Sequence, residues 1–339
     1  MKQIPLLLLL ASLLFAGCEK ALMPADEKAT SVGTFEYLWQ RFDEQYSMFD
    51  VKDIDWQQVH DTLRPKVFAG MGSDSLFNVC AAMLNLLNDG HVNLYSGYDV
   101  SHSDSIYYRF YADDGIDDNV VVLHYLGAGY RSAGGVAYSA LRDSTVIYLR
   151  YASFSNTLGV NQLRHIINRY PKAKGMILDL RGNGGGSLSN VETLLKIMPS
   201  HGQQLYSSQI KSGKGHGEFT PLAATYAPTV ADSAAFTLPV VVLIDRGCFS
   251  ATSTFAICTQ AYDNMVLMGD TTGGGMGLPG MGVLPNGWRY RLSVTRTIAL
   301  DGRNYENGVP PDILLPFDRE KAERDGLDNI IEAACEYIL

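Results

Sequence analysis

Cysteine is scarce in this chain, and its few residues form neither a metal-binding pattern nor a disulfide framework. Only five occur in 339 residues, and four of them lie beyond the N-terminal region, at Cys80, Cys248, Cys258 and Cys335. Their spacing lacks the close pairs of ligands that bind zinc. Cys80 falls on an apolar helical pattern, so buried free thiols are predicted, while pairing of two of them stays open in an exported protein.

Positive charge is also in short supply. The 27 Lys and Arg residues are outnumbered by 36 Asp and Glu, the net charge is −9 at pH 7, and no basic tract occurs. Such a chain is a poor ligand for a phosphate backbone, so a nucleic-acid partner is excluded. No Gly-Lys-Ser or Gly-Lys-Thr occurs either, which excludes a P-loop nucleotide site.

The apolar run near the N-terminus is too short to form a stable membrane-spanning helix. It covers residues 6–14, follows the basic start Met1-Lys2 and precedes Phe15-Ala16-Gly17-Cys18. Residues 1–17 are therefore predicted to be a secretory signal. The end of this segment resembles the cleavage motif of bacterial lipoproteins, in which Cys18 would become the lipidated first residue. A plain secretory signal with a chance cysteine is the alternative.

Lipidation would anchor the protein to a membrane without spanning it. Removal of the first 17 residues takes away one Lys and no acid, so the net charge becomes −10. Residues 18–30 then form a lipidated tether. Glu19, rather than Asp, follows Cys18 and gives no signal for retention in the inner membrane. The expected location is the outer membrane of a Gram-negative bacterium, on its periplasmic or surface face.

Residues 31–93 are predicted to form a helical N-terminal module. Thr34 is a possible N-cap, and apolar side chains then recur at helical spacing, at Phe35, Leu38, Trp39, Phe42 and Tyr46. A second helix is expected over 56–63. A third begins near Ser73 and ends at Asn88-Asp89-Gly90, a good C-terminal stop. His91 therefore stands just beyond the last helix.

The remainder alternates between strand and helix patterns, which favours an α/β layer structure. Strands are expected over residues 120–124, 136–139, 145–151, 176–180, 240–244, 265–268 and 288–297. Helices are expected over residues 160–169, 189–197 and 250–260. Residues 94–143 are assigned to a linking segment with strands, and residues 144–339 to the core.

Ser250 follows an apolar strand and a short turn and stands at the start of a predicted helix. Free backbone N–H groups and the helix dipole favour an anion at such a place, which suits a nucleophilic hydroxyl. The flanking residues Cys248 and Thr252 do not make a Gly-x-Ser-x-Gly elbow. An ordinary N-cap serine is the alternative.

A glycine loop, Gly182-Asn183-Gly184-Gly185-Gly186, also connects a strand to a helix. Glycines let backbone N–H groups turn toward a bound anion, as an oxyanion requires. A nucleotide phosphate site is the rival interpretation. The dinucleotide fingerprint is imperfect, however, because its third glycine position is Ser187.

His91 and Glu306 complete a candidate site for acyl transfer. A base, an orienting acid and an anion-binding loop are what a serine nucleophile requires. His91 lies between the helical module and the α/β part, and Glu306 precedes the rigid turn Asn307-Gly308-Val309-Pro310. Taken alone, either residue could be an ordinary surface or structural side chain.

Taken together, these segments resemble the C-terminal-processing and tricorn peptidase family. The resemblance rests on residues 177–186, 241–251 and 307–312, on the strand at 145–154 and on the opening helical module. It implies a layered α/β core of the crotonase and Clp-protease type with a helical cap. Processing peptidases of this family normally carry a PDZ domain between the helical module and the core. Only about 50 residues occupy that interval here, too few for a full PDZ domain to fit comfortably.

One branch of that family uses a Ser–Lys dyad, and the place of its Lys is Gly275 here. No Lys occurs between Lys214 and Lys321, so the dyad is absent. The tricorn branch uses a His, a Ser and a Glu, which Ser250, His91 and Glu306 match. Tricorn also has a Ser before its His, where this chain has Gly90.

The resemblance implies a serine peptidase with a Ser250 acyl-enzyme, His91 as general base and Glu306 as orienting acid. The oxyanion donors would be the N–H groups of Ala251 and of Gly184 or Gly185. Neither a metal nor an organic cofactor is implied, and the partner is a peptide or protein substrate. Two alternatives remain: a binding protein that holds a ligand or peptide without turnover, and an esterase.

Overall fold

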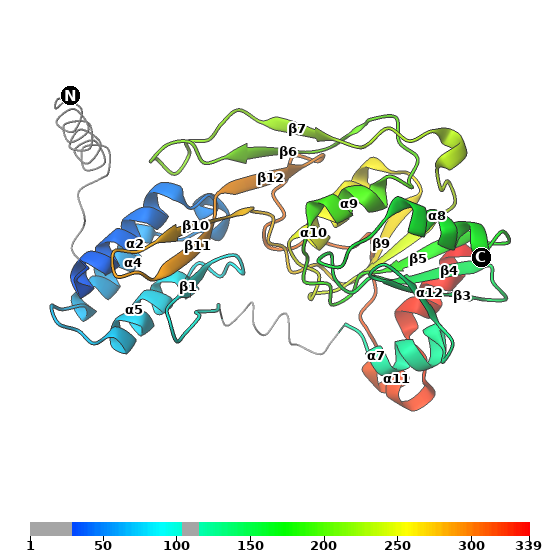
Figure 1. Ribbon diagram of the computed structural model, residues 1–339, viewed down its shortest axis with the longest axis horizontal. Coiled ribbons are helices and arrows are strands. Elements are labelled where there is room, and N and C mark those ends of the chain that lie inside the picture. The colour runs from blue at the N-terminus through cyan, green and yellow to red at the C-terminus, as the bar shows by residue number, and fades with distance from the viewer. Residues whose placement is uncertain (1–28, 104–114) are drawn as a thin grey trace, which may run out of the picture.

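The computed structural model describes residues 29–103 and 115–339, so the predicted signal, Cys18 and nearly all of the predicted tether lie outside the described residues. A helical region at the N-terminal end lies beside a larger α/β body (Figure 1). Within these two ranges, no helix is both long and apolar enough to cross a membrane.

Helices at the N-terminal end pack around an apolar core. They are α2 (Ser31–Gln45), α3 (Phe49–Lys52), α4 (Trp56–Leu63), the 3₁₀ turn η1 (Arg64–Lys66) and α5 (Ser73–Asn85). The predicted helical stripe is confirmed, because Phe35, Leu38 and Phe42 of α2 are fully buried. The predicted cap is wrong: the side chain of Thr30 accepts the cap hydrogen bond, and Thr34 is buried inside the first turn.

A three-stranded sheet completes this core with residues from much later in the chain. It has the order β1 (Asn93–Tyr95), β11 (Arg289–Ser293) and β10 (Pro279–Val283), with all neighbours antiparallel. The buried cluster of the helices also contains Leu94, Leu284, Trp288, Tyr290 and Leu292. The helical region therefore depends on a segment that the sequence placed with the core.

The α/β body is built on a seven-stranded sheet. Its order is β13 (Ile313–Leu314), β9 (Met265–Gly269), β8 (Val240–Ile244), β5 (Gly175–Asp179), β4 (Val146–Arg150), β3 (Val136–Leu141) and β2 (Arg131–Ala133). The first five are parallel neighbours, and β3 and β2 are antiparallel. Every residue of β4, β5 and β8 is buried, as expected for parallel strands covered on both faces.

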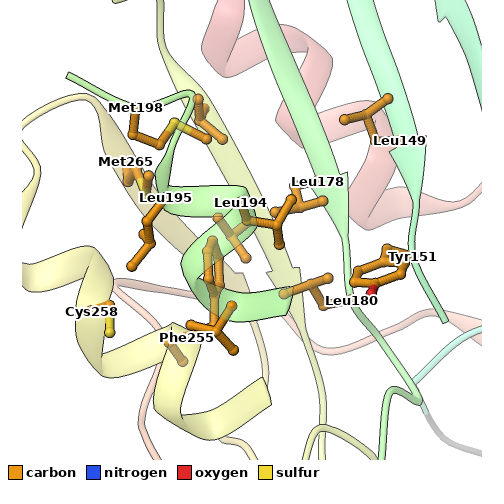
Figure 2. Close-up of a cluster of buried hydrophobic side chains, with 14 of the residues drawn as sticks. Leu149, Tyr151, Leu178, Leu180, Leu194, Leu195, Met198, Phe255, Cys258 and Met265 are labelled. Atoms are coloured by element: carbon orange, nitrogen blue, oxygen red, sulfur yellow. The ribbon is translucent and has the colours of Figure 1, made fainter. Parts of the chain in front are cut away.

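Helices cover both faces of this sheet. One face packs against α8 (Val160–Arg169), α9 (Leu188–Leu195) and α10 (Ala251–Cys258), and Figure 2 shows part of this cluster around Leu178 and Phe255. The other face packs against α12 (Asn329–Ile338) and the segment that carries Tyr125. The predicted α/β layers are confirmed. Smaller elements of this body are η3 (Asp232–Ala234), η4 (Thr259–Ala261) and α11 (Arg319–Asp325).

A third sheet extends from the body alongside the helical region (Figure 1). It has the order β12 (Thr295–Ala299), β6 (Gln204–Ile210) and β7 (Ala223–Tyr226), again antiparallel. Strand β12 follows β11 after a single residue, so the predicted strand over 288–297 becomes two strands in two different sheets.

The strand predicted over residues 120–124 is wrong. This segment forms the short helix α7 (Asp118–Val120) and the π-helix η2 (Val121–Leu126). A short apolar run does not distinguish a strand from a buried helix. The missed signal is Asp117, whose carboxylate accepts hydrogen bonds from the N–H groups of Asn119 and Val120 and so caps the helix.

Candidate active site

Ser250 lies between strand β8 and helix α10 in an unusual backbone conformation. Its φ is 55° and its ψ is −116°, a region that non-glycine residues rarely adopt. The Ser250 N–H donates to the carbonyl of Gly274 at 2.9 Å, which holds this turn in place. The hydroxyl makes no capping hydrogen bond to the helix. The alternative of an ordinary N-cap serine is therefore excluded.

The hydroxyl of Ser250 instead faces His91. Its Oγ lies 3.1 Å from Nε2 of His91, although the two residues are 159 positions apart. His91 follows α5 in the helical region and is 3% exposed, while Ser250 belongs to the α/β body. The ring of His91 packs against Phe249 with 4.8 Å between ring centroids. The predicted nucleophile and base therefore meet at hydrogen-bond distance.

Asp89 fixes the chain at His91, a role that sequence reasoning missed. One carboxylate oxygen accepts the backbone N–H of His91 at 2.7 Å, and the other accepts the hydroxyls of Tyr46 and Ser293 at 3.0 and 2.9 Å. Asp89 itself is 1% exposed. An Asp two residues before the backbone group that it binds is a turn pattern that the sequence Asp89-Gly90-His91 displays.

The surroundings of His91 favour a neutral imidazole. Burial lowers the pKa of His91 to about 4, although the charge of Asp89 opposes this change, and the charge of Arg291 lowers the pKa further. The Nδ1 atom is buried without a well-formed hydrogen bond in the described part of the chain. A weaker interaction with the backbone of Gly277 favours the protonated ring. A neutral ring can accept the proton of Ser250.

Glu306 is buried near His91 but does not contact it through a direct hydrogen bond. Its Oε2 accepts the backbone N–H groups of Met276 and Gly277 at 2.7 and 3.2 Å. Burial raises the pKa of Glu306 to about 8, with a further contribution from the charge of Asp89. Gly277 thus lies between the carboxylate of Glu306 and the ring of His91.

Lys52, at the end of α3, is a second residue that the sequence did not suggest. Its ammonium donates to the carbonyl of Asn88 and to Oδ1 of Asn307, each at 3.0 Å, and lies 3.5 Å from Oε1 of Glu306. Its side chain is only 6% exposed. Because its charge lowers the pKa of Glu306, Lys52 favours the ionised carboxylate.

The glycine loop lies against Ser250. A side chain at Gly185, which has a φ of +100°, would approach Cβ of Ser250 to 2.9 Å and the N atom of Ala251 to 3.1 Å. The N–H of Gly185 donates to Oδ1 of Asn183. Within residues 29–103 and 115–339, the N–H groups of Gly184 and Ala251 have no hydrogen-bond acceptor. Of the two predicted glycines, Gly184 therefore has the available donor.

Asp245 joins this loop to the turn that carries Ser250. One of its carboxylate oxygens accepts N–H groups from Gly182, Gly247 and Cys248 at 2.8, 2.9 and 3.2 Å. Side-chain hydrogen bonds to two different loops restrict their relative motion. Asp245 is thus a positioning residue for the whole site.

Gly275 stands at the place of the lysine in a Ser–Lys dyad, and the ring of Phe249 lies beside it. A Cβ atom at Gly275, whose φ is +74°, would lie 2.2 Å from the ring of Phe249. Phe249 is 5% exposed and also contacts His91. An aromatic ring therefore fills the space beside Gly275.

The four cysteines in the described part of the chain are all buried and free, which confirms the prediction of free thiols. Cys248 lies in the turn before Ser250, and its Sγ donates to the carbonyl of Leu180 at 3.0 Å. The described residues contain no group of three or more His, Cys, Asp or Glu side chains that could hold a metal ion.

Comparisons with known proteins identify the family of this chain. Residues 145–315 match peptidase family S41, and residues 29–85 match the Tricorn protease C1 domain. The carboxy-terminal processing protease CtpA of Bacillus subtilis (strain 168) is 28% identical over 179 residues, which are 52% of this chain and 36% of that protein. The matched region thus spans about a third of the length of this curated relative.

Solved structures share the fold over nearly the whole chain. The crystal structure of a protein from Parabacteroides merdae ATCC 43184 matches this chain with a TM-score of 0.85 and 34% sequence identity. The match covers 91% of this chain and 97% of that one. The tricorn protease has a TM-score of 0.52 and 14% identity, covering 91% of this chain and 36% of that one. The match over half of the sequence and the close structural likeness place this chain in peptidase family S41.

Proposed function

We propose that the protein is a serine peptidase that hydrolyses peptide bonds in peptide or protein substrates through an acyl-enzyme on Ser250. The observation that carries this proposal is the 3.1 Å contact between Oγ of Ser250 and Nε2 of a buried His91. A neutral base in contact with a hydroxyl at a strained helix start is the arrangement that activates a serine.

In the proposed reaction, Oγ of Ser250 attacks the substrate carbonyl carbon while Nε2 of His91 takes the hydroxyl proton. The resulting oxyanion accepts hydrogen bonds from the N–H groups of Ala251 and Gly184. His91 then returns the proton to the leaving amine, and the peptide bond breaks. Water hydrolyses the acyl-enzyme through the same base.

Glu306 is proposed to orient His91 indirectly. Its carboxylate holds the N–H groups of Met276 and Gly277, and the backbone of Gly277 interacts with the ring of His91. This indirect role supports our proposal that the chain belongs to the tricorn-like branch of the family, without a Ser–Lys dyad. The crowding between Gly275 and Phe249 supports that assignment, because the dyad's lysine has no room there. The core is proposed to be of the crotonase and Clp-protease type.

Cys18 is proposed to carry a lipid anchor that holds the protein at the outer membrane of a Gram-negative bacterium. The support is the sequence of residues 1–18 alone. Metabolic labelling with a palmitate analogue, compared between wild type and Cys18→Ala, tests this proposal. Labelling that persists in Cys18→Ala would contradict it.

The test of the serine is labelling of the purified protein with a fluorophosphonate, read by intact mass. Wild type is expected to gain one adduct, and Ser250→Ala none, because the phosphonate reacts with an activated hydroxyl. Circular dichroism of both proteins is the control for folding. A folded wild type that gains no adduct would contradict the proposal and favour a binding protein. Turnover of matched ester and peptide substrates separates an esterase from a peptidase.

Gly275→Ala is expected to slow this labelling more than tenfold. The new methyl group would overlap the ring of Phe249, which packs on His91, so the base would move away from Ser250. The matched control is Gly287→Ala, since Gly287 has a similar φ of +87° and open space around it. Both variants should lose about 1 kcal/mol of stability through the backbone. Equal labelling rates in the two variants would show that Phe249 does not position His91.

A further inference from the structure

One face of the small sheet β1–β11–β10 points away from the helices. This face extends from the neighbourhood of His91 toward the solvent. Side chains alternate along a strand, so Tyr290 and Leu292 of β11 enter the helical core, while Arg289, Arg291 and Ser293 share the opposite face. Ser293 donates its hydroxyl to Asp89, which holds His91. The face that carries Arg291 therefore begins at the catalytic centre.

The neighbouring strands contribute to the same face. Residues paired directly across an antiparallel sheet have side chains on one side, and Arg291 pairs with Asn93 of β1 and with Met281 of β10. Met281 is 63% exposed and Val283 is 61% exposed. The face is thus apolar at β10 and solvent-accessible.

Strand β10 has almost no side chains on its other side. A Cβ atom at Gly282 would lie 2.2 Å from the ring of Tyr290, so the glycine lets that ring pack directly on the strand. This arrangement presses β10 against the helical region and leaves Pro279, Met281 and Val283 facing outward. The outward face is a fixed surface rather than a mobile loop tip.

Two guanidinium groups on this face have no acidic partner in the described part of the chain. Arg291 is half-buried, and its one hydrogen bond within the described residues is a long one of 3.4 Å to Oδ1 of Asn93. Arg289 is exposed and forms no ion pair with a described residue. The chain has a net charge of −9, and several other arginines near its surface pair with carboxylates, so two neighbouring guanidinium groups without such a partner leave positive charge on this face.

Arg291 lies close enough to affect the catalytic base. Burial is the main cause of the lowered pKa of His91, and the positive charge of Arg291 lowers it further. A substrate bound at Ser250 and extending over the sheet face would bring its own groups to this guanidinium. A planar guanidinium with free N–H donors is suited to bind a carboxylate through two hydrogen bonds.

We propose that Arg291 binds a carboxylate of the peptide substrate, so that the sheet face beside His91 selects acidic peptides or peptides near their C-terminus. Met281 and Val283 then cover apolar substrate side chains beyond the carboxylate. This inference rests on the proposed peptidase function and adds the substrate class. The carboxylate is either an Asp or Glu side chain or the terminal carboxylate, and the test below separates these two sources.

The experiment measures how well peptides protect Ser250 from a fluorophosphonate, so no physiological substrate is needed. Four random hexapeptide libraries are compared: with or without Asp and Glu, and with a free or an amidated C-terminus. The library that has no carboxylate is expected to need about a 10- to 100-fold higher concentration for half-protection than the best carboxylate library. Two libraries contain only one kind of carboxylate, either the side chains of Asp and Glu or the free C-terminus. The one of these two that protects Ser250 at the lower concentration identifies the kind of carboxylate that is bound.

Variants assign this preference to Arg291. Arg291→Gln is expected to remove the difference between the libraries, and Arg291→Lys to keep part of it, because charge remains but the bidentate geometry is lost. Arg291→Glu should favour libraries rich in Lys and Arg. The matched control is Arg324→Gln, which removes an exposed guanidinium on α11 that pairs with Asp325. It should behave as wild type.

The outcomes separate the two proposals. Absence of labelling in wild type contradicts the activated serine itself. Normal labelling that the four libraries slow equally, or not at all, overturns the carboxylate site and leaves the serine peptidase intact. A preference that survives unchanged in Arg291→Gln would also overturn the inference.

Discussion

The reaction of Ser250 with a fluorophosphonate is expected to accelerate in two steps as the pH rises, one near pH 4 and one near pH 8. The first step is the loss of the proton from His91, because only the neutral ring can accept the proton of Ser250, and burial lowers the pKa of His91 to about 4. The second is the ionisation of Glu306, whose pKa burial raises to about 8. At pH 5 the enzyme should therefore retain activity that a histidine of ordinary pKa would have lost.

Three variants assign these steps. His91→Ala should react about 1000-fold more slowly than wild type and lack the step near pH 4, because the base is gone. Glu306→Gln keeps the size of the side chain and should lack only the step near pH 8. Lys52→Met should move that step to higher pH, since the ammonium of Lys52 favours the ionised carboxylate of Glu306. A step near pH 8 that persists in Glu306→Gln would contradict the proposed role of that residue.

Arg181→Met is expected to lower the free energy of unfolding by about 3–5 kcal/mol, since breaking a buried ion pair leaves uncompensated charge. The guanidinium of Arg181 is fully buried and contacts the carboxylates of Asp179 and Asp328 at 2.6 and 2.8 Å. Burial alone would raise the pKa of Asp179, but the charge of Arg181 outweighs it and lowers this pKa. The variant would bury two carboxylates without their cation.

Urea unfolding, followed by circular dichroism, measures this loss. The matched control is Arg246→Gln, because Arg246 pairs with Asp270 at the surface, where both side chains are more than 40% exposed. That variant should lose about 0.5 kcal/mol or less. A loss below about 1 kcal/mol in Arg181→Met would mean that hydrophobic packing alone holds α12, which Asp328 caps, against the sheet.

Much of the fold could be predicted from local patterns. Strand β8 and helices α4 and α8 have the predicted bounds, because apolar runs and helical spacing report burial directly. The strand predicted over residues 120–124 was wrong, since a short apolar run suits a buried helix as well as a strand. The membership of β10 and β11 in the core of the helical region could not be predicted, because it depends on pairing over nearly 200 residues.

The candidate site could likewise be predicted from the sequence only in part. Ser250, His91 and Glu306 belong to recognisable motifs, and the structure brings the first two together. Lys52 could not be predicted, because nothing near it in the sequence marks it as different from a surface lysine. Phe249 was visible next to Ser250, but its role depends on the distant Gly275. Side chains that act through tertiary contacts leave little trace in the local sequence.

The contact between His91 and Ser250 joins two separately packed hydrophobic cores. His91 is held by a segment of the helical core, and Ser250 by the core of the seven-stranded sheet. A separation of the two bodies by a few ångströms would break the pair while both cores stayed folded. The proposed catalytic contact is therefore more fragile than either half of the molecule, and hydrolytic activity should report the closed arrangement of the protein rather than its folded state alone.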